Sequence, residues 1–402
     1  MPQPFSTSPS RPSRGSSRPA LRRALRPTLA VAAATVVLAG CGSGDDASGT
    51  SGASGDAVDV VVTTSQLGDI VREVGGSSVD VHQILSANTD PHEYEPRPSD
   101  VTATAGAKVV FASGLGLDDW VADVQKQSGA KAQLVKVGDT VPTKLAGEGE
   151  HAHDEEAGHD HAEDEAGHDH ADEEAGHDHA EGEAGHDHAE GEASHAEEEH
   201  AAEEEHAGHD HGDGEFDAHW WHDPKNVEHA VGVVRDALVK ADPGAADAIR
   251  KSASAYLTKV QDLDAKIEQC VSAVPKGERK LVTSHDAFGY FAHRYEITVV
   301  GAAIPSQTTR AQPSAQDVAR LTKLIRTEKV KAIFPESSVN PKLADAIAKE
   351  TGASSDLTLY GDTLGPDGSD GDTYLGMEAH NADAVVRGLT GKAKGCDAAP
   401  TR

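Results

Sequence analysis

Histidine and carboxylate side chains stand at equivalent places in several segments that are predicted to be strands. His92 lies in "NTDPHEYEPRPSD", shortly after a predicted strand, and His285 and Glu336 each end another. Asp362 ends the last predicted strand, and His219 lies in "FDAHWWHDPKN". Ligands of open parallel sheets bind beyond the carboxyl ends of the strands. One such residue alone is commonly an ordinary polar side chain, but several at equivalent positions in both halves of the chain predict a ligand site.

The elements that must position these residues alternate between strand and helix patterns. Buried-strand runs such as "VDVVVTT" are followed by segments with apolar residues at helical spacing, such as "SQLGDIVREVGG". The predicted strands are 58–64, 79–85, 108–113, 280–285, 297–304, 330–336 and 354–362. This order predicts an α/β fold with two lobes, each built on a parallel sheet flanked by helices.

Two helical segments separate the two strand-rich blocks. The second begins at Pro243 and contains about 30 helix-forming residues, which would reach roughly 45 Å at 1.5 Å per residue. A helix of that length can run from one lobe to the other. We therefore expect an N-terminal lobe at 58–224, linking helices at 225–277 and a C-terminal lobe at 278–402.

The N-terminus has the features of an export signal. Arginine-rich residues precede the apolar run "PTLAVAAATVVLAG", which is too short for a stable transmembrane helix. The run ends in Leu38-Ala39-Gly40-Cys41, which resembles the bacterial lipobox, although a chance small-residue cleavage site before an ordinary cysteine is the alternative. We expect a signal peptide at 1–40, lipidation of Cys41, a flexible tether at 41–57, and an extracytoplasmic protein anchored to the bacterial cell membrane.

Two further cysteines, Cys270 and Cys396, lie outside this signal. In an exported chain an even pair predicts a disulfide, which would tie the C-terminus to the end of the long helix. Free thiols are one alternative. Metal ligation is another, although the pair lacks CxxC spacing.

An acidic insert interrupts the predicted first lobe just before the segment of His219. Residues 147–213 contain 27 Asp or Glu, no Lys or Arg, and 15 of the 23 histidines. We expect this insert to be disordered without metal. Its His-x-His pairs could bind several zinc ions weakly and attract cations, whereas a solvated spacer without a role is the alternative. The repeated Gly-His-Asp-His histidines are His159, His161, His168, His170, His177, His179, His186 and His188.

The charge distribution also excludes one class of partner. Outside the insert the chain is only mildly acidic, and no cluster of Lys and Arg occurs in the mature region. Phosphate binding needs such a cluster, so we expect no nucleic-acid partner.

Four segments resemble, in order, the motifs of metal-binding solute receptors of ABC transporters for zinc and manganese: "DPHEYEPRPSD", "DAHWWHDPKN", "SHDAFGYFAHRY" and "YGDTLGPDGSDGDTYLGMEAHN". The resemblance extends from Val58 to the C-terminus. It implies two α/β lobes joined by one long rigid helix, with a metal in the cleft between them. The implied ligands are His92, His219, His285 and Asp362. Glu336 matches a glutamate near the family's site, where we expect it to orient a ligand by hydrogen bonding.

The second motif departs from the family pattern. Ala218 replaces the usual proline, and His222 stands three residues after His219, so either histidine could reach the metal. Alignment with Trp221 in the tryptophan position of the motif favours His219. For His222 we expect a surface imidazole or one that supports a ligand.

Three imidazoles and one carboxylate suit tetrahedral Zn²⁺. Mn²⁺ favours more oxygen ligands, and the manganese receptors that this sequence resembles carry Glu in place of His285. Zinc is therefore the predicted metal, although Cu²⁺ or Ni²⁺ could bind in vitro.

Together these features predict a monomeric, lipid-anchored receptor that captures zinc and delivers it to an ABC permease. We expect no enzymatic activity, because a fourth protein ligand closes the zinc site and the sequence contains no HExxH motif. The alternatives are a surface zinc buffer or adhesin without a transporter, and a zinc hydrolase.

Overall fold

The computed structural model describes residues 57–147 and 215–399. The signal segment, Cys41, the tether up to residue 56 and the histidines of the acidic insert lie outside the described residues, so the expectations for them remain predictions. Among the described residues, no helix combines the length and the apolar character needed to cross a membrane.

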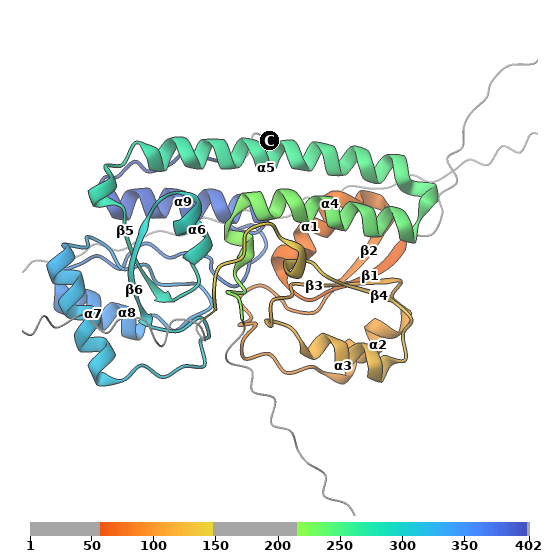
Figure 1. Ribbon diagram of the computed structural model, residues 1–402, viewed down its shortest axis with the longest axis horizontal. Helices are drawn as coiled ribbons and strands as arrows, with labels where there is room; N and C mark the ends of the chain where they lie inside the picture. Colours follow the sequence, from red (N-terminus) through yellow and green to blue (C-terminus); the bar gives the residue numbers. More distant parts are fainter. Residues whose placement is uncertain (1–56, 148–214, 400–402) are drawn as a thin grey trace, which may run out of the picture. The chain divides into compact units, whose positions relative to one another are not determined.

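The first lobe is built on a four-stranded parallel sheet in the order β2-β1-β3-β4 (Figure 1). The two central strands are almost entirely buried, as their runs of valine, "VDVVV" and "VVFA", predict. The strands are β1 (Val58–Val62), β2 (Val79–Gln83), β3 (Val109–Ala112) and β4 (Gln133–Lys136). The parallel order predicted for this block is confirmed, and β4 adds an edge strand.

Three helices connect these strands: α1 (Ser65–Gly75), α2 (Pro98–Gly106) and α3 (Trp120–Ser128). The start of α1 is fixed by Thr64, whose side chain accepts a hydrogen bond from the Leu67 backbone N–H at 3.4 Å. Its apolar side chains at helical spacing are buried in the core beneath the sheet. The N-terminal end of α1 therefore lies at the carboxyl edge of β1, where the candidate site is found.

Two helices follow the insert. α4 (Pro224–Ala241) is capped by Asp223, whose side chain accepts from the Lys225 N–H at 2.9 Å. A 3-10 turn (Pro243–Ala245) then precedes α5 (Ala246–Ser272), so Pro243 begins this turn rather than the α-helix itself. With 27 residues, α5 is roughly 40 Å long.

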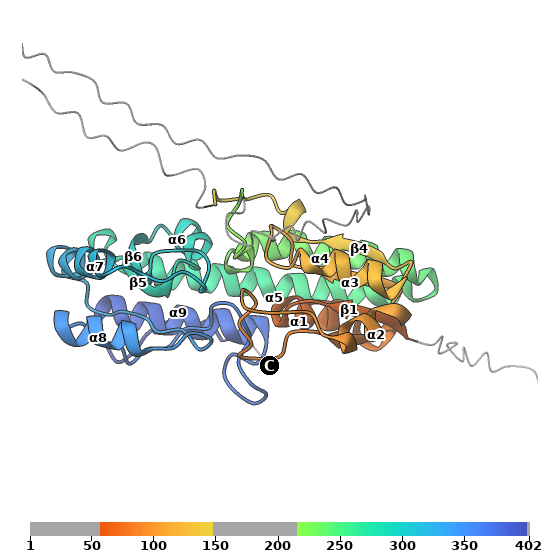
Figure 2. The same ribbon diagram turned by 90° about the horizontal axis from the view of Figure 1, so that it is seen from below.

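α5 packs against α1 and α4 of the first lobe and against α9 (Tyr374–Thr390) of the second. Figures 1 and 2 show it running past elements of both lobes. The prediction of one long connecting helix is therefore confirmed.

The second lobe contains two parallel strands and four helices. The strands β5 (Lys280–His285) and β6 (Thr298–Ile304) pair with a register shift between Leu281 and Val282. The other elements are α6 (Gly289–Arg294), α7 (Ala315–Glu328), α8 (Lys342–Thr351) and α9.

Two strands predicted for this lobe, 330–336 and 354–362, are not regular strands. Both segments make only isolated parallel bridges, which join Ala332 to Ser354, Glu336 to Leu359, and Phe334 to Thr283 of β5. The two segments are joined to each other by the bridges from Ala332 to Ser354 and then from Glu336 to Leu359. The second bridge is shifted by one residue relative to the first, and Pro335 has no N–H to donate. This slip and the missing donor interrupt the ladder, although the segments still bring Glu336 and Asp362 to the same edge as β5.

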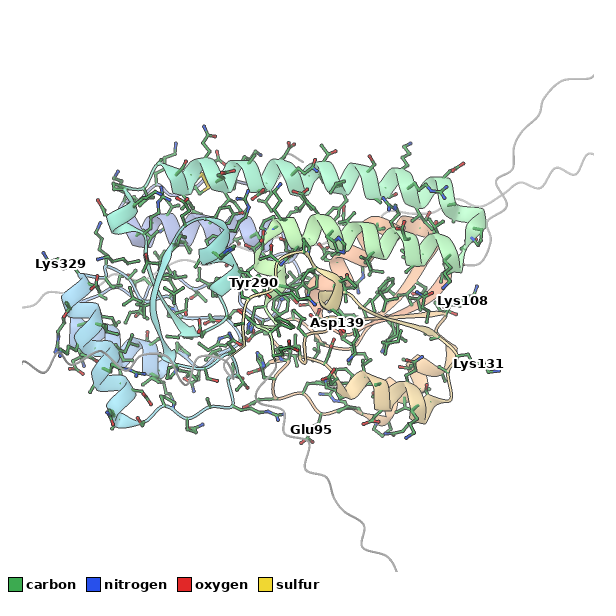
Figure 3. All side chains as sticks on the ribbon, viewed as in Figure 1. Glu95, Lys108, Lys131, Asp139, Tyr290 and Lys329 are labelled. Atoms are coloured by element: carbon green, nitrogen blue, oxygen red, sulfur yellow. A yellow bond between two sulfur atoms is a disulfide. The ribbon has the colours of Figure 1, made fainter. Side chains whose placement is uncertain are left out.

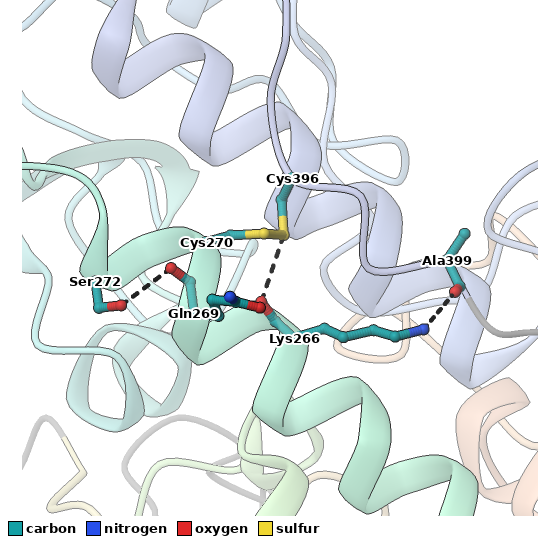
Figure 4. Close-up of a disulfide and its surroundings, with 6 residues drawn as sticks. All are labelled: Lys266, Gln269, Cys270, Ser272, Cys396 and Ala399. Carbon is teal, nitrogen blue, oxygen red and sulfur yellow. Dashed lines mark hydrogen bonds between the residues drawn. A yellow bond between two sulfur atoms is a disulfide. The ribbon is translucent and has the colours of Figure 1, made fainter.

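A disulfide joins Cys270 near the end of α5 to Cys396 in the C-terminal segment (Figure 4). The predicted pairing is confirmed, so the alternatives of free thiols and metal ligation are wrong. Beside it, the Lys266 ammonium donates to the Ala399 carbonyl at 3.1 Å. The bond encloses a sequence separation of 126 residues, which removes much conformational freedom from the unfolded chain.

Replacing both Cys270 and Cys396 by serine should therefore lower the free energy of unfolding by about 2–5 kcal/mol, measured by urea denaturation. A thiol reductant should destabilise the wild type by a similar amount and leave the double variant unchanged. Equal stability of the oxidised wild type and the variant would contradict this expectation.

Candidate metal centre

Four polar atoms converge between the lobes: Nε2 of His92, His219 and His285, and Oδ1 of Asp362. All four lie within 4.8 Å of one another. The Asp362 oxygen is 3.7, 3.2 and 3.4 Å from Nε2 of His92, His219 and His285, respectively. Each of these atoms is buried and has no hydrogen-bond partner among the described residues.

These distances fit a metal ion. In a tetrahedral zinc site with bonds of about 2.1 Å, ligand atoms are roughly 3.4 Å apart. Buried polar atoms without partners are costly and rare in native proteins. A cation at the centre of the group would satisfy all four atoms at once.

The four residues come from both lobes, as their positions after strands predicted. His92 lies in the loop after β2, and His219 precedes the 3-10 turn Trp220–His222 (η4). His285 is the last residue of β5, and Asp362 follows the bridge between Glu336 and Leu359. The side chain of His92 is 11% exposed, whereas the side chains of His219 and His285 are fully buried. Solvent therefore reaches the group from the side of His92.

Asp217 fixes the orientation of His219. Its Oδ1 lies 2.6 Å from Nδ1 of the ring and accepts from the His219 backbone N–H at 2.9 Å. A proton on Nδ1 is thereby directed to the carboxylate, and the lone pair of Nε2 faces the group. Asp217 occupies the aspartate position of the second motif, but the sequence alone does not indicate its role.

Glu336 lies beside the ring of His285 as an ion-pair partner and forms its hydrogen bond with the His285 backbone. Its Oε2 is 2.9 Å from Nδ1 of the ring, and its Oε1 accepts from the His285 backbone N–H at 3.0 Å. Glu336 is not one of the four converging groups. A Cβ at residue 361 would collide with Oε2 of Glu336, so any side chain in place of Gly361 would displace this carboxylate.

Asp90 occupies the corresponding position of the first motif but acts differently. Its Oδ1 accepts from the His92 backbone N–H at 2.9 Å, whereas its Oδ2 accepts from the Thr309 hydroxyl at 2.6 Å. Asp90 therefore ties the loop of His92 to the second lobe. The aspartate of this motif was likewise not assigned a role from the sequence.

His222 lies outside the group, and of the two alternatives expected for it the surface position is wrong. The residue is fully buried, its Nδ1 is 2.7 Å from Oε1 of Glu378, and its ring stacks on Phe288 at 4.4 Å. Burial raises the pKa of Glu378, and the adjacent His222 opposes this. His219, not His222, faces the converging atoms.

The electrostatics of the group favour bound positive charge. Burial opposes protonation of His219, but Asp217 and Asp362 outweigh it and raise its pKa to about 9. Burial likewise opposes charge on His285, whose pKa is nevertheless raised well above its usual value by Glu336 and Asp362. Burial also opposes charge on Asp362, yet the histidines, His285 first, hold its pKa well below the usual range. Protons and a metal cation would therefore compete for the same space.

Comparisons with known proteins agree with this arrangement. Residues 60–388 match the family model described as "ZnuA: Zinc-uptake complex component A periplasmic". The chain is 29% identical over 368 residues to the manganese-binding lipoprotein MntA of Bacillus subtilis, which covers 90% of this chain and 97% of MntA. It is 27% identical over 345 residues to the metal ABC transporter substrate-binding lipoprotein FimA of Streptococcus parasanguinis, with coverage of 85% and 92%.

The fold agrees with a solved relative. The structure of the periplasmic zinc-binding protein TroA from Treponema pallidum matches with a TM-score of 0.60 and 25% identity, covering 82% of this chain and 98% of TroA. The resemblance drawn from the four motifs is thereby confirmed. This chain belongs to the ZnuA family of metal-binding receptors of ABC transporters.

Proposed function

We propose that this protein captures Zn²⁺ outside the cytoplasmic membrane and delivers it to an ABC permease. The observation that carries the proposal is the group of four buried, unpartnered donor atoms at distances suited to a tetrahedral ion. Relatives are named for manganese as well as for zinc, so the choice of metal rests on the donor set. Three nitrogens and one oxygen favour Zn²⁺ over Mn²⁺.

In this proposal His92, His219, His285 and Asp362 bind the ion, and Asp217 and Glu336 orient two of the imidazoles. Such carboxylate partners raise the basicity of the ligands and hold their rings in place. Four protein ligands fill a tetrahedral site and leave no position for a reactive water, which supports a carrier rather than a hydrolase. We further propose that the receptor is a monomer anchored through a lipid on Cys41.

The insert is proposed to be an accessory zinc collector. Its two ends are paired: Ala146 bridges Phe216, and the Asp217 N–H donates to the Leu145 carbonyl at 3.0 Å. Tyr290 of α6, labelled in Figure 3, contacts both ends, because its hydroxyl accepts from the Leu145 N–H and donates to the Asp217 carbonyl. Since Asp217 also contacts His219, the insert begins and ends close to the candidate centre.

Metal selectivity tests the donor set. Replacing His285 by Glu should lower affinity for zinc relative to manganese by about tenfold or more, because an imidazole is exchanged for oxygen donors. Competitive titration of the purified protein with both metals would measure the ratio. His380→Gln, which alters a histidine outside the group, serves as the control, and an unchanged ratio in His285→Glu would remove His285 from the ligand set.

Zinc affinity should rise with pH between about 6.5 and 8.5, by about tenfold per pH unit for each proton displaced. The reason is that His219, with a pKa of about 9, still holds its proton in this range. The raised pKa of His219 should also stabilise the metal-free folded protein. This contribution to the free energy of unfolding is complete below about pH 6.5, where His219 is protonated in the unfolded chain as well, and it is lost as pH rises to about 9. Zinc affinity would be measured by titration, and the stability of the metal-free protein by urea denaturation in the presence of a chelator. If neither quantity changed between these pH values, the raised pKa of His219 would be contradicted.

Removing residues 148–213 should leave one tight zinc site and abolish the weaker ones. The paired ends of the insert can be joined by a short turn, and the loss of 27 acidic residues changes the formal charge of the chain from −32 to −5. Attraction of cations at low salt should fall accordingly. Native mass spectrometry would count the ions. Loss of the tight site would place it within the insert, and an unchanged count would make the insert a bystander.

A further inference from the structure

The segment that carries Asp362 is attached to the opposite lobe. Residues 361–364 belong to the second lobe in sequence, but the Gly361 carbonyl accepts from the indole N–H of Trp221 at 3.0 Å and from Nε2 of Gln66 at 3.4 Å. Trp221 belongs to η4 and Gln66 to the first turn of α1. Both donors therefore come from the first lobe.

Two more hydrogen bonds continue this attachment. The Leu364 N–H donates to the Ser65 hydroxyl at 2.9 Å, and the Asn88 N–H donates to the Thr363 hydroxyl at 2.8 Å. Ser65, Thr363 and Leu364 are each at most 5% exposed. Water therefore cannot readily replace the bond between Leu364 and Ser65, whereas Asn88 is exposed.

The second lobe holds the same segment less closely. It fixes Tyr360 firmly, because Asn381 of α9 bonds both the Tyr360 N–H at 2.9 Å and its carbonyl at 2.8 Å. At Asp362 itself, the contacts from this lobe are the Ser338 hydroxyl, 3.4 Å from Oδ2, and Nε2 of His285, 3.4 Å from Oδ1. The position of Asp362 thus depends on partners across the lobe boundary.

Trp221 touches both halves of the candidate centre. Its ring packs edge-on against that of His219, with centroids 5.4 Å apart and an interplanar angle of 70°, while its N–H reaches the Gly361 carbonyl. The side chain is fully buried. One residue therefore fixes the spacing between a histidine of the first lobe and the carboxylate of the second.

We propose that Trp221 and Ser65 are positioning residues: their hydrogen bonds across the lobe boundary hold Asp362 at the ion and slow the release of the ion. The inference rests on the proposed function, because it requires that Asp362 bind the ion. His285 lies in the same lobe as Asp362, whereas His92 and His219 lie in the other, so these hydrogen bonds hold one half of the donor set against the other half. Without them Asp362 is held less firmly at the ion, which then dissociates faster.

Trp220 provides a matched control for Trp221. It is the adjacent residue, it is 1% exposed, and its indole N–H donates to the carbonyl and the hydroxyl of Ser113, both at 3.1 Å, within the first lobe. Trp221→Phe and Trp220→Phe each remove one buried indole N–H and leave a buried carbonyl without that donor. Their effects on stability should therefore be similar.

The test uses the full chain loaded with one equivalent of Zn²⁺ and measures the rate of zinc loss to a chelator. Trp221→Phe should release zinc about tenfold faster than the wild type, equivalent to about 1.4 kcal/mol, whereas Trp220→Phe should match the wild type. With Co²⁺ as the probe, only Trp221→Phe should alter the visible absorption of the four-coordinate ion. Equal release rates and spectra in the two variants would overturn the inference.

A second pair keeps the test valid if a tryptophan variant fails to fold. Ser65→Ala removes the interlobe acceptor, whereas Ser337→Ala removes a buried hydroxyl that has no hydrogen-bond partner among the described residues. Faster release in Ser65→Ala alone supports the inference, and equal rates contradict it. If the wild type itself bound no metal tightly, the proposed function would be wrong. If the wild type bound metal tightly but the variants of each pair behaved alike, only the positioning role of Trp221 and Ser65 would be wrong.

Discussion

Four buried polar atoms that face one another without hydrogen-bond partners set the central constraint on this structure. Three imidazole nitrogens and a carboxylate oxygen cannot remain in a water-poor space at low free energy unless positive charge lies between them. Protons supply that charge in the metal-free protein, which is why the pKa of His219 is raised to about 9 despite its burial. A divalent cation would supply this positive charge from a single point that all four atoms face.

The carboxylates around this group keep the rings aimed inward. Asp217 and Glu336 contact the outward nitrogens of His219 and His285, so each imidazole presents its other nitrogen to the centre. Together with Asp362 they place three carboxylates near three imidazoles. When metal binding has displaced the protons from the imidazoles, these carboxylates give the site a negative formal charge that a divalent cation reduces, and burial strengthens this attraction.

The elements that support the candidate metal centre are of two kinds: the long helix α5, and the strand ends and loops that carry the converging residues. α5 packs against elements of both lobes, and the disulfide fastens the C-terminal segment to it. The four converging residues, in contrast, lie at strand ends and in loops, where backbone position depends on neighbouring segments. Small changes in the contact between lobes can therefore move Asp362 without altering either core.

The sequence by itself determined the alternation of strands and helices, the long connecting helix, the cysteine pair and the identity of the converging residues, because these follow from local periodicity and from motifs. Only the tertiary structure decided that 330–336 and 354–362 fall short of regular strands, that His222 is buried against Glu378, and that Asp217 and Asp90 of similar motifs have different partners. It also decided that Trp221 reaches across to Gly361. Residue types and spacing specify which groups are available, whereas the direction of a side chain and the register of a distant pairing depend on contacts between segments far apart in the chain.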